Sequence, residues 1–513
     1  MRRLLGSIGY ADAVDTLDCL HRPAPTDAAG RQDVVAAVAG AMAGGLLFLL
    51  THRSLIDDAY ITLTYARNVA FHLHWGLIEQ QTSNTATSPL NVWLLAVVTM
   101  LVREPVVAVG VILMVTSAAT AVWSARIARQ TGVSWIAPVL TVVALLVSPL
   151  LGSTIGLETF MAASLVVGLA HYAVLGRPVA AGVISGLLVL TRPDLVVFSV
   201  VAVLGVAALR RWMPVVIAVA ILVALPWHLI SWVLLGSALP DTFLLKTRGG
   251  RWDDSYNLAT GWQLYGQAYP AATVLAAGPA VLGLLCLLAW GTPALRRAVP
   301  NGLAVPVVTG VGGLAHLAAF AALGTSPYHW YYGPSVAGLT CCAAFTAAAL
   351  LGAAPRSLGV VAAAPLAILA VFSAGFALGR GVPWTVAPIT TNWALPGQYA
   401  RVGADLAANV EDQTISGPGE IGTLVYFCDC PIADAFSDRG VMNAVIRHRE
   451  REAGPLERRL LQLNYRYLDR DSLPARPDRI LRYDGAQRAD GPGQWDTVSP
   501  WTGPGRLVLV PAR

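Results

Sequence analysis

The chain has 513 residues, of which 55% are hydrophobic and 13% are charged, and its mean hydropathy is +0.59. Soluble globular proteins carry roughly 25% charged residues, so this composition excludes an ordinary soluble protein. The formal net charge is +5, but the cations are scattered among short segments rather than gathered on one face, which argues against nucleic-acid binding.

Apolar runs of roughly 16 to 25 residues, which is long enough to cross a bilayer, recur up to about residue 380. They predict a polytopic α-helical membrane protein. We expect about eleven spans, at 34–51, 105–125, 133–151, 159–175, 178–191, 195–209, 213–235, 271–290, 302–322, 332–351 and 357–379. The apolar segment 90–102 is expected to lie along the membrane interface instead of crossing.

The segments between these spans indicate the orientation of the chain. Arginines concentrate on one side, at Arg2, Arg3, Arg126, Arg129, Arg177, Arg296 and Arg297. By the positive-inside rule this side is cytoplasmic, so residues 1–33 form an expected cytoplasmic tail and the C-terminus is extracytoplasmic. Outer loops at 53–104 and 236–270 then interrupt a transmembrane domain that covers 34–379.

Beyond residue 379 charged residues become frequent, and glycine, proline and aspartate separate short apolar stretches. This pattern predicts a small extracytoplasmic α/β domain over 380–513. Strands are expected at 414–415, 422–428 and 432–436, and helices at 441–451 and 456–463.

Two adjacent carboxylates, Asp57 and Asp58, follow the first span directly. Charged groups at the mouth of a membrane helix are costly to place and commonly functional. Such a carboxylate can take a proton from a sugar hydroxyl as a general base. Capping of a helix N-terminus explains one aspartate well and two less well, so we predict that the pair is catalytic.

Cations near the bilayer are candidates for binding a phosphate group. Lys246 is the single lysine of the chain, and Arg248 follows two residues later. Arg192 lies between two short apolar segments, beside Asp194. Anchoring of a span at the interface is the alternative for Lys246 and Arg248, and a local contact with Asp194 is the alternative for Arg192.

A substrate pocket is predicted from residues at the outer ends of the spans. It includes Tyr60, Glu158 and the aromatic group His329, Trp330 and Tyr331. Aromatic rings stack on sugars, but tryptophan and tyrosine also favour the headgroup layer in general, and Glu158 can simply cap a helix. The acids Glu420, Asp434 and Asp438 of the C-terminal part are interpreted as solvated loop residues.

No metal site or cofactor is expected. Cys428 and Cys430 have no histidine or third cysteine nearby in the sequence, so a zinc site is disfavoured and a disulfide is left open. A divalent cation beside the paired aspartates is also left open, although two acids alone form a weak site. Absence of a phosphate-binding GxxxxGK[ST] loop disfavours primary active transport.

Five motifs occur in order along the membrane part of the chain. They are Asp-Asp-Ala-Tyr-Ile at 57–61, Thr-Ser-Pro-Leu-Asn-Val-Trp at 87–93, Gly-Leu-Glu-Thr at 156–159, Leu-Thr-Arg-Pro-Asp at 190–194 and Leu-Pro-Asp-Thr-Phe-Leu-Leu-Lys at 239–246. This ordered set resembles the GT-C membrane glycosyltransferases, and most of all the AftB-type arabinofuranosyltransferases of mycobacterial cell-wall assembly.

The resemblance implies a polyprenyl-phosphate-linked sugar donor, used at the outer face of the plasma membrane. For the AftB-like branch the donor is decaprenyl-phosphoryl-arabinofuranose, and the acceptor is a growing arabinan of arabinogalactan or lipoarabinomannan. Asp57 and Asp58 match the catalytic acidic pair of the family, and Lys246 matches a cation that contacts the donor phosphate. Glu158 and Arg192 match motif positions.

The chain also departs from the family pattern. Thr64 stands where the family often has arginine, and segment 80–85 lacks an expected Glu-Gly element. Both departures border the expected sugar pocket. A hexosyl transferase of the mannosyl type, a carrier or flippase for lipid-linked glycans, and a non-catalytic assembly partner therefore remain as alternatives.

Overall fold

The computed structural model of the chain describes residues 27–242, 256–299, 302–353, 356–410, 413–485 and 493–512. Lys246 and Arg248, the two predicted phosphate-binding cations of the second outer loop, lie outside these residues.

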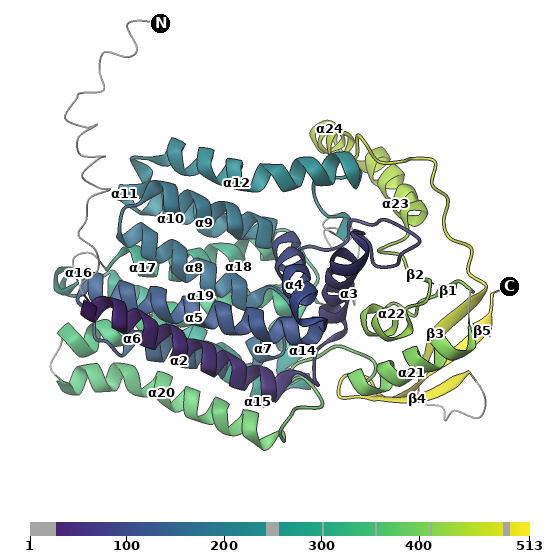
Figure 1. The fold of residues 1–513 in the computed structure, drawn as a ribbon. Helices are drawn as coiled ribbons and strands as arrows, with labels where there is room; N and C mark the ends of the chain where they lie inside the picture. Colours follow the sequence, from purple (N-terminus) through teal and green to yellow (C-terminus); the bar gives the residue numbers. More distant parts are fainter. Residues whose placement is uncertain are drawn as a thin grey trace, which may run out of the picture.

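The membrane part is a bundle of helices that run in roughly one direction or its reverse (Figure 1). In the described part of the chain, six helices are long and apolar enough to cross a bilayer. They belong to α2 (Asp27–Thr51), α5 (Pro105–Thr131), α12 (Met213–Leu234), α15 (Pro270–Trp290), α17–η2–α18 (Ala304–Pro306, Val307–Val311 and Gly312–Ala322) and α19 (His329–Ala353).

Shorter apolar helices fill the remaining predicted spans. They are α6 (Ala137–Leu146), α8 (Thr159–Val174), α9 (Pro178–Thr191), η1–α10 (Pro193–Leu195 and Val196–Gly205) and the later part of α20 (Arg356–Gly379). Several of these helices begin with proline at the first turn, where the missing N–H costs no hydrogen bond. The predicted polytopic helical membrane protein is confirmed, while the number of crossings and the orientation stay predictions.

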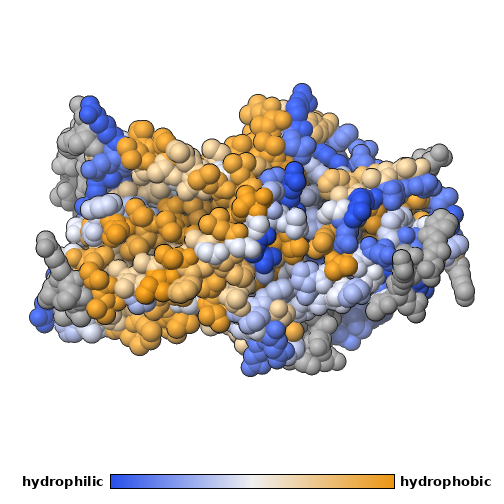
Figure 2. Space-filling view, turned by 90° about the horizontal axis from the view of Figure 1, so that it is seen from below, coloured by the Kyte–Doolittle hydropathy of each residue, from blue (hydrophilic) through white to orange (hydrophobic). Residues whose placement is uncertain are grey.

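Burial orders the bundle around α19. Of the most apolar 18-residue stretch of each helix, 83% is buried in α19 and 11% in α12. Helix α19 is therefore central, and α12 lies at the outside of the bundle. Apolar side chains cover the outer surface of the membrane half, and hydrophilic residues dominate the C-terminal half (Figure 2). The segment 90–102 is helix α4 (Pro89–Val102), which packs on α3 (Asp57–His72) and α5.

The C-terminal part is a five-stranded mixed sheet with helices, as the predicted small α/β domain requires. Its strand order is β2-β1-β3-β5-β4, with β1 parallel to β2 and β3, and β5 antiparallel to β3 and β4. The strands are β1 (Ile415–Ser416), β2 (Ile432–Ala433), β3 (Arg479–Gly485), β4 (Gln494–Ser499) and β5 (Gly503–Pro511). The helices are α21 (Pro396–Asn409), α22 (Gly422–Cys428), α23 (Arg439–Glu452) and α24 (Pro455–Asn464).

One strand prediction is wrong. Residues 422–428 form helix α22 and not a strand. The two oxygens of the Asp57 side chain accept hydrogen bonds from the backbone N–H groups of Gly422 (2.9 Å) and Thr423 (2.8 Å). Asp57 thus satisfies the first N–H groups of α22, which no residue of the helix itself can do.

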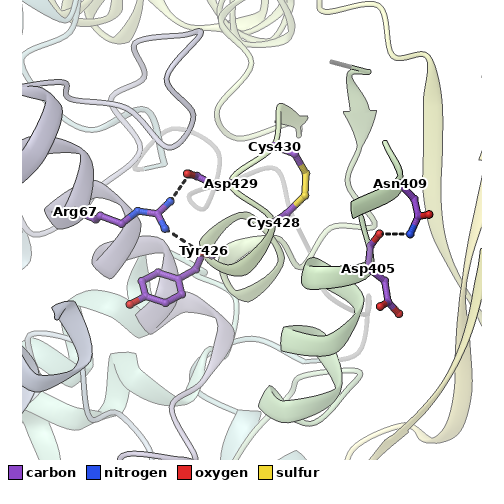
Figure 3. Close-up of a disulfide and its surroundings, with 7 residues drawn as sticks. All are labelled: Arg67, Asp405, Asn409, Tyr426, Cys428, Asp429 and Cys430. Atoms are coloured by element: carbon purple, nitrogen blue, oxygen red, sulfur yellow. Dashed lines mark hydrogen bonds and ion pairs between the residues drawn. A yellow bond between two sulfur atoms is a disulfide. The ribbon is translucent and has the colours of Figure 1, made fainter. Parts of the chain in front are cut away.

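Helix α3 also holds the other end of α22. Arg67 donates to the carbonyl oxygen of Tyr426 (2.9 Å) and to the carboxylate of Asp429 (2.7 Å), as Figure 3 shows. Just beyond, Cys428 and Cys430 form a disulfide (Figure 3). Gly422 allows the close approach of the two helices, because a Cβ atom there would lie 2.0 Å from the carbonyl oxygen of Asp57.

Candidate active site

A cavity of about 450 Å³ lies at the junction of the membrane part and the C-terminal domain. Five carboxylates are on its wall, three from the membrane part and two from the C-terminal domain: Asp57, Asp58, Glu158, Glu420 and Asp434. Aromatic side chains from both parts complete the wall: Tyr256, Tyr328, Trp330, Tyr331, Trp393, Phe436 and Trp501. A cavity at a domain junction that combines rings with hydrogen-bonding acids suits a carbohydrate.

Asp57, the first acid of the pair, is buried, and its side chain binds the C-terminal domain. Its carboxylate accepts hydrogen bonds from two N–H groups of α22, and its backbone N–H donates to the side chain of Asn392 (3.2 Å). Burial raises the pKa of Asp57 to about 6, and the neighbouring charge of Asp58 adds to the rise.

Asp58, the second acid, is half-buried on the cavity wall. One residue along a helix turns the side chain by about 100°, so the two neighbours cannot face the same way. The structure distinguishes the two members of the predicted pair: both line the cavity, but the carboxylate of Asp57 accepts two hydrogen bonds from α22.

Glu158 lies on the same wall and belongs to a buried charged network. Arg192 binds Glu158 through Nη1 (3.3 Å) and Asp194 through Nε (3.0 Å). His316 Nε2 contacts the second oxygen of Asp194 (2.8 Å), and its Nδ1 contacts Ser335 (2.8 Å). The local contact between Arg192 and Asp194 is therefore present, and Glu158 extends it to the cavity.

Arg192 itself is not among the residues that line the cavity. Its guanidinium lies 4.9 Å from the ring centroid of Tyr331, which does line it. Arg192 thus orients Glu158 and Tyr331 from behind the wall, and its predicted contact with a phosphate stays a prediction.

The C-terminal domain contributes two acids to the cavity wall, Glu420 and Asp434. Glu420 accepts hydrogen bonds from the N–H of Trp393 (2.9 Å) and the hydroxyl of Tyr399 (2.5 Å). Burial, followed by the charge of Asp57, raises the pKa of Glu420 to about 8. Asp434 is buried and accepts from the N–H of Phe436 (2.6 Å).

The interpretation of these acids as solvated loop residues is therefore wrong for Glu420 and Asp434, which lie on the cavity wall. It is also wrong for Asp438, which is buried. Asp438 accepts from the N–H groups of Gly440 (2.8 Å) and Val441 (3.3 Å) and so caps α23.

Two of the predicted pocket aromatics lie on the wall, and two other predicted residues lie behind it. Trp330 and Tyr331 line the cavity, as expected from their place at the start of α19. Tyr60 is buried against the rings of Tyr426 (5.2 Å) and Phe427 (5.7 Å) of α22. The structure therefore places Tyr60 in the contact between α3 and α22 instead of on the cavity wall.

His329 is likewise outside the set of cavity-lining residues. It is buried between the rings of Tyr265 (6.0 Å) and Trp330 (4.9 Å). Both of its ring nitrogens lack a hydrogen-bond partner among the described residues. His329 supports the position of Trp330 by packing.

Comparison with known proteins bears on the fold. No family model and no curated protein sequence matches the chain. The structure is similar to crystal structures of ArnT from Cupriavidus metallidurans. The apo form matches with a TM-score of 0.55 and 15% identity, over 94% of this chain and 98% of that one. The form bound to undecaprenyl phosphate matches with a TM-score of 0.54 and 14% identity, over 92% and 97%.

The chain shares the fold of these ArnT structures. A mycobacterial arabinofuranosyltransferase, AftD, matches more weakly, with a TM-score of 0.44 and 16% identity, over 82% of this chain and 33% of that one. The ArnT structures confirm the fold that the resemblance implies, and the AftB-type branch stays a prediction.

The sequence leaves open a divalent cation beside the paired aspartates. Within the described ranges, no group of three or more histidine, cysteine, aspartate or glutamate side chains can hold a metal ion. Four carboxylates of the cavity, those of Asp57, Glu158, Glu420 and Asp434, accept hydrogen bonds from backbone, tyrosine or arginine donors.

Threonines and an asparagine on the cavity wall were also missed from the sequence: Thr62, Thr85, Thr87, Thr242, Thr391 and Asn392. A signal existed for three of them: Thr242 lies within the Leu-Pro-Asp-Thr motif at 239–246, and Thr85 and Thr87 fall within or beside the Thr-Ser-Pro motif of the first outer loop. Tyr65 fixes this loop by contacting the Thr85 hydroxyl (2.7 Å) and the Ser83 hydroxyl (2.5 Å).

Proposed function

We propose that this protein is a glycosyltransferase that moves a sugar from a polyprenyl phosphate to a hydroxyl group of a cell-envelope glycan. The observation that carries the proposal is the cavity between the membrane helices and the C-terminal domain, with Asp58 on its wall. A lipid-linked donor has to reach its site from the bilayer, and a glycan acceptor has to arrive from water. A cavity at this junction is open to both kinds of substrate.

The similarity to ArnT supports a lipid donor, because that protein was crystallised with undecaprenyl phosphate and the match covers 97% of its chain. For this chain we propose decaprenyl-phosphoryl-arabinofuranose as the donor and an arabinan as the acceptor, at the outer face of the plasma membrane. The support for arabinofuranose comes from the ordered motifs between Asp57 and Lys246.

In the proposed reaction the bond between the anomeric carbon and the phosphate oxygen breaks, and the lipid phosphate leaves as an anion. The anomeric carbon forms a new bond to the acceptor hydroxyl oxygen, and Asp58 takes the hydroxyl proton. The phosphate is already a good leaving group, so positioning and electrostatics supply most of the acceleration.

The two parts of the chain then have separate tasks. Lys246 and Arg248, which follow the cavity residue Thr242 in the sequence, are the proposed phosphate ligands. The rings of Trp393 and Trp501 are the proposed stacking surfaces for the acceptor sugar. Glu420 accepts hydrogen bonds from hydroxyl groups of that sugar. Asp57 positions this second wall by binding α22.

Transfer from labelled decaprenyl-phosphoryl-arabinofuranose to a short arabinofuranosyl acceptor tests the proposal. Wild type and the control Asp471→Asn, a change at an exposed residue, are expected to transfer. Asp58→Asn is expected to lose activity by roughly a thousandfold, the scale of a lost general base, without loss of folding.

The other outcomes discriminate among the alternatives. Transfer only from a polyprenyl-phosphate hexose would keep the glycosyltransferase and overturn arabinose as the sugar. Full activity of Asp58→Asn would remove Asp58 from the chemistry. Failure of the folded wild type with every lipid-phosphate sugar would favour a carrier.

A further inference from the structure

Helix α24 presents an exposed stripe of leucines. Leu456, Leu460 and Leu463 are 73%, 58% and 52% exposed, and Tyr467 extends the stripe beyond the helix. Their spacing of four, three and four residues places these side chains on one face. No residue of α24 is fully buried, so packing within the C-terminal domain does not explain the stripe.

The other faces of α24 either pack on α23 or carry polar side chains. Leu461 packs against the small apolar cluster formed with α23, and Glu457 binds Arg449 of α23 (3.0 Å). Arg458 and Gln462 are exposed on the side away from the leucines. The helix therefore has an attached face, a polar face and an apolar face.

The apolar face adjoins the end of a candidate membrane span. Trp232 of α12 donates its indole N–H to the carbonyl oxygen of Leu463 (2.8 Å), and its ring lies 5.1 Å from that of Tyr467. The N–H of Leu239 donates to the side chain of Asn464 (2.9 Å). Figure 1 shows α24 beside the end of α12 that is nearest the C-terminal domain.

The end of α12 is itself apolar and exposed: Leu229, Ile230, Val233 and Leu234 are the outward side chains of its last two turns. Since only 11% of the most apolar stretch of the candidate span α12 is buried, we expect lipid to cover these residues. The leucine stripe of α24 continues this lipid-facing surface past the end of the span, through Trp232.

We propose that α24 lies in the headgroup layer of the membrane, with its leucine stripe inserted among the acyl chains of the lipids. A short helix with leucines on one face and arginines on another is the form of an interfacial amphipathic helix. Tryptophan and tyrosine, here Trp232 and Tyr467, favour the same layer. Arg458 and Arg459 then lie at the level of the lipid phosphates.

The insertion would attach the C-terminal domain to the bilayer independently of the contact between α3 and α22. It would keep the cavity wall that carries Glu420 and Asp434 at a constant height above the membrane surface. The inference does not depend on the proposed sugar transfer, because it concerns only the position of α24.

Depth-dependent fluorescence quenching tests the position of α24. In a Cys19→Ser, Cys286→Ser background, Leu460→Cys or Gln462→Cys carries an environment-sensitive fluorophore, with the full chain in nanodiscs of phosphatidylcholine and phosphatidylglycerol. Cys341 and Cys342 are buried, and Cys428 and Cys430 are joined, so labelling is confined to the new site.

The label at residue 460 is expected to emit at shorter wavelength and to be quenched several-fold more by nitroxides on lipid acyl chains than the label at 462. The label at 462 is expected to be quenched more by a water-soluble nitroxide. Equal quenching of both sites by the aqueous quencher would overturn the proposal. If a label at 460 disturbs folding, Leu456→Cys tests the same face.

Discussion

The membrane helices form one wall of the cavity (the membrane wall), and the C-terminal domain forms the other (the outer wall). The two walls bind their carboxylates differently. Glu158, on the membrane side, is bound to a buried guanidinium, that of Arg192. Glu420, on the other side, is bound by neutral donors, a tyrosine hydroxyl and a backbone N–H. Burial raises the pKa of both carboxylates; the charge of Arg192 opposes the rise at Glu158, and hydrogen bonds from neutral donors oppose it at Glu420. Burial likewise raises the pKa of Asp57 on the membrane wall, so carboxylates on both walls have raised pKa values.

The largest effect is expected from breaking the membrane wall with Arg192→Ala. This change leaves Glu158 and Asp194 buried without their shared cation, a loss that costs about 3–5 kcal/mol in comparable buried pairs. We expect a large fall in the melting temperature of the purified protein. Arg401→Ala, at an exposed arginine of α21, is the matched control. Equal melting temperatures for the two variants would show that the network does not stabilise the membrane wall.

A smaller effect is expected from loosening the outer wall with Asp57→Asn. An amide keeps one acceptor oxygen but points its N–H₂ group at an N–H donor of α22, at a cost of about 1–3 kcal/mol. Thermal stability and transfer should therefore fall together, and the C-terminal domain should become more sensitive to protease. Asp58→Asn, by contrast, should lose transfer alone. An Asp57→Asn protein as stable as wild type and yet inactive would place Asp57 in the chemistry itself.

The smallest expected effect is a change in pH dependence in Glu420→Gln. The pKa of Glu420 is raised to about 8, so between its ordinary range and pH 8 the folded protein retains a proton that the unfolded chain loses. Stability from this group is present in acid and is lost as the pH rises toward 8. The melting temperature of wild type should decrease over this interval, and that of Glu420→Gln should decrease less. Parallel profiles for the two proteins would contradict the assignment.

The membrane wall was largely predictable from the sequence, because apolar runs mark where helices end and therefore where polar residues meet the outer surface. Asp58, Glu158, Trp330 and Tyr331 were all chosen on this basis, and all four line the cavity. The helices predicted at 441–451 and 456–463 also correspond to α23 and α24, because their amphipathic periodicity is local.

The outer wall was not predictable in the same way. Glu420, Trp393 and Trp501 reach the cavity only because the C-terminal domain folds over α3, and no local pattern states this. Segment 422–428 illustrates the reason, since its β-branched and aromatic residues favour a strand. Its helical state is supported by hydrogen bonds to Asp57, which is 365 residues away in the chain. Tyr60 and His329 were placed on the wall by sequence proximity, but their rings pack just behind it.

The two ends of α22 carry opposite partial charges, and α3 meets each with a side chain of the complementary sign: Asp57 at the N-terminus and Arg67 at the C-terminus. This arrangement fixes the direction of α22 relative to α3. A reversed helix would bring the carboxylate to carbonyl oxygens and the guanidinium to N–H groups, so only the parallel alignment of α3 and α22 is attractive at both contacts. It also encodes register, because a slip of one residue along α3 would exchange the surroundings of Asp57 and Asp58. The docking of the C-terminal domain thus decides which of two identical neighbouring carboxylates α22 binds.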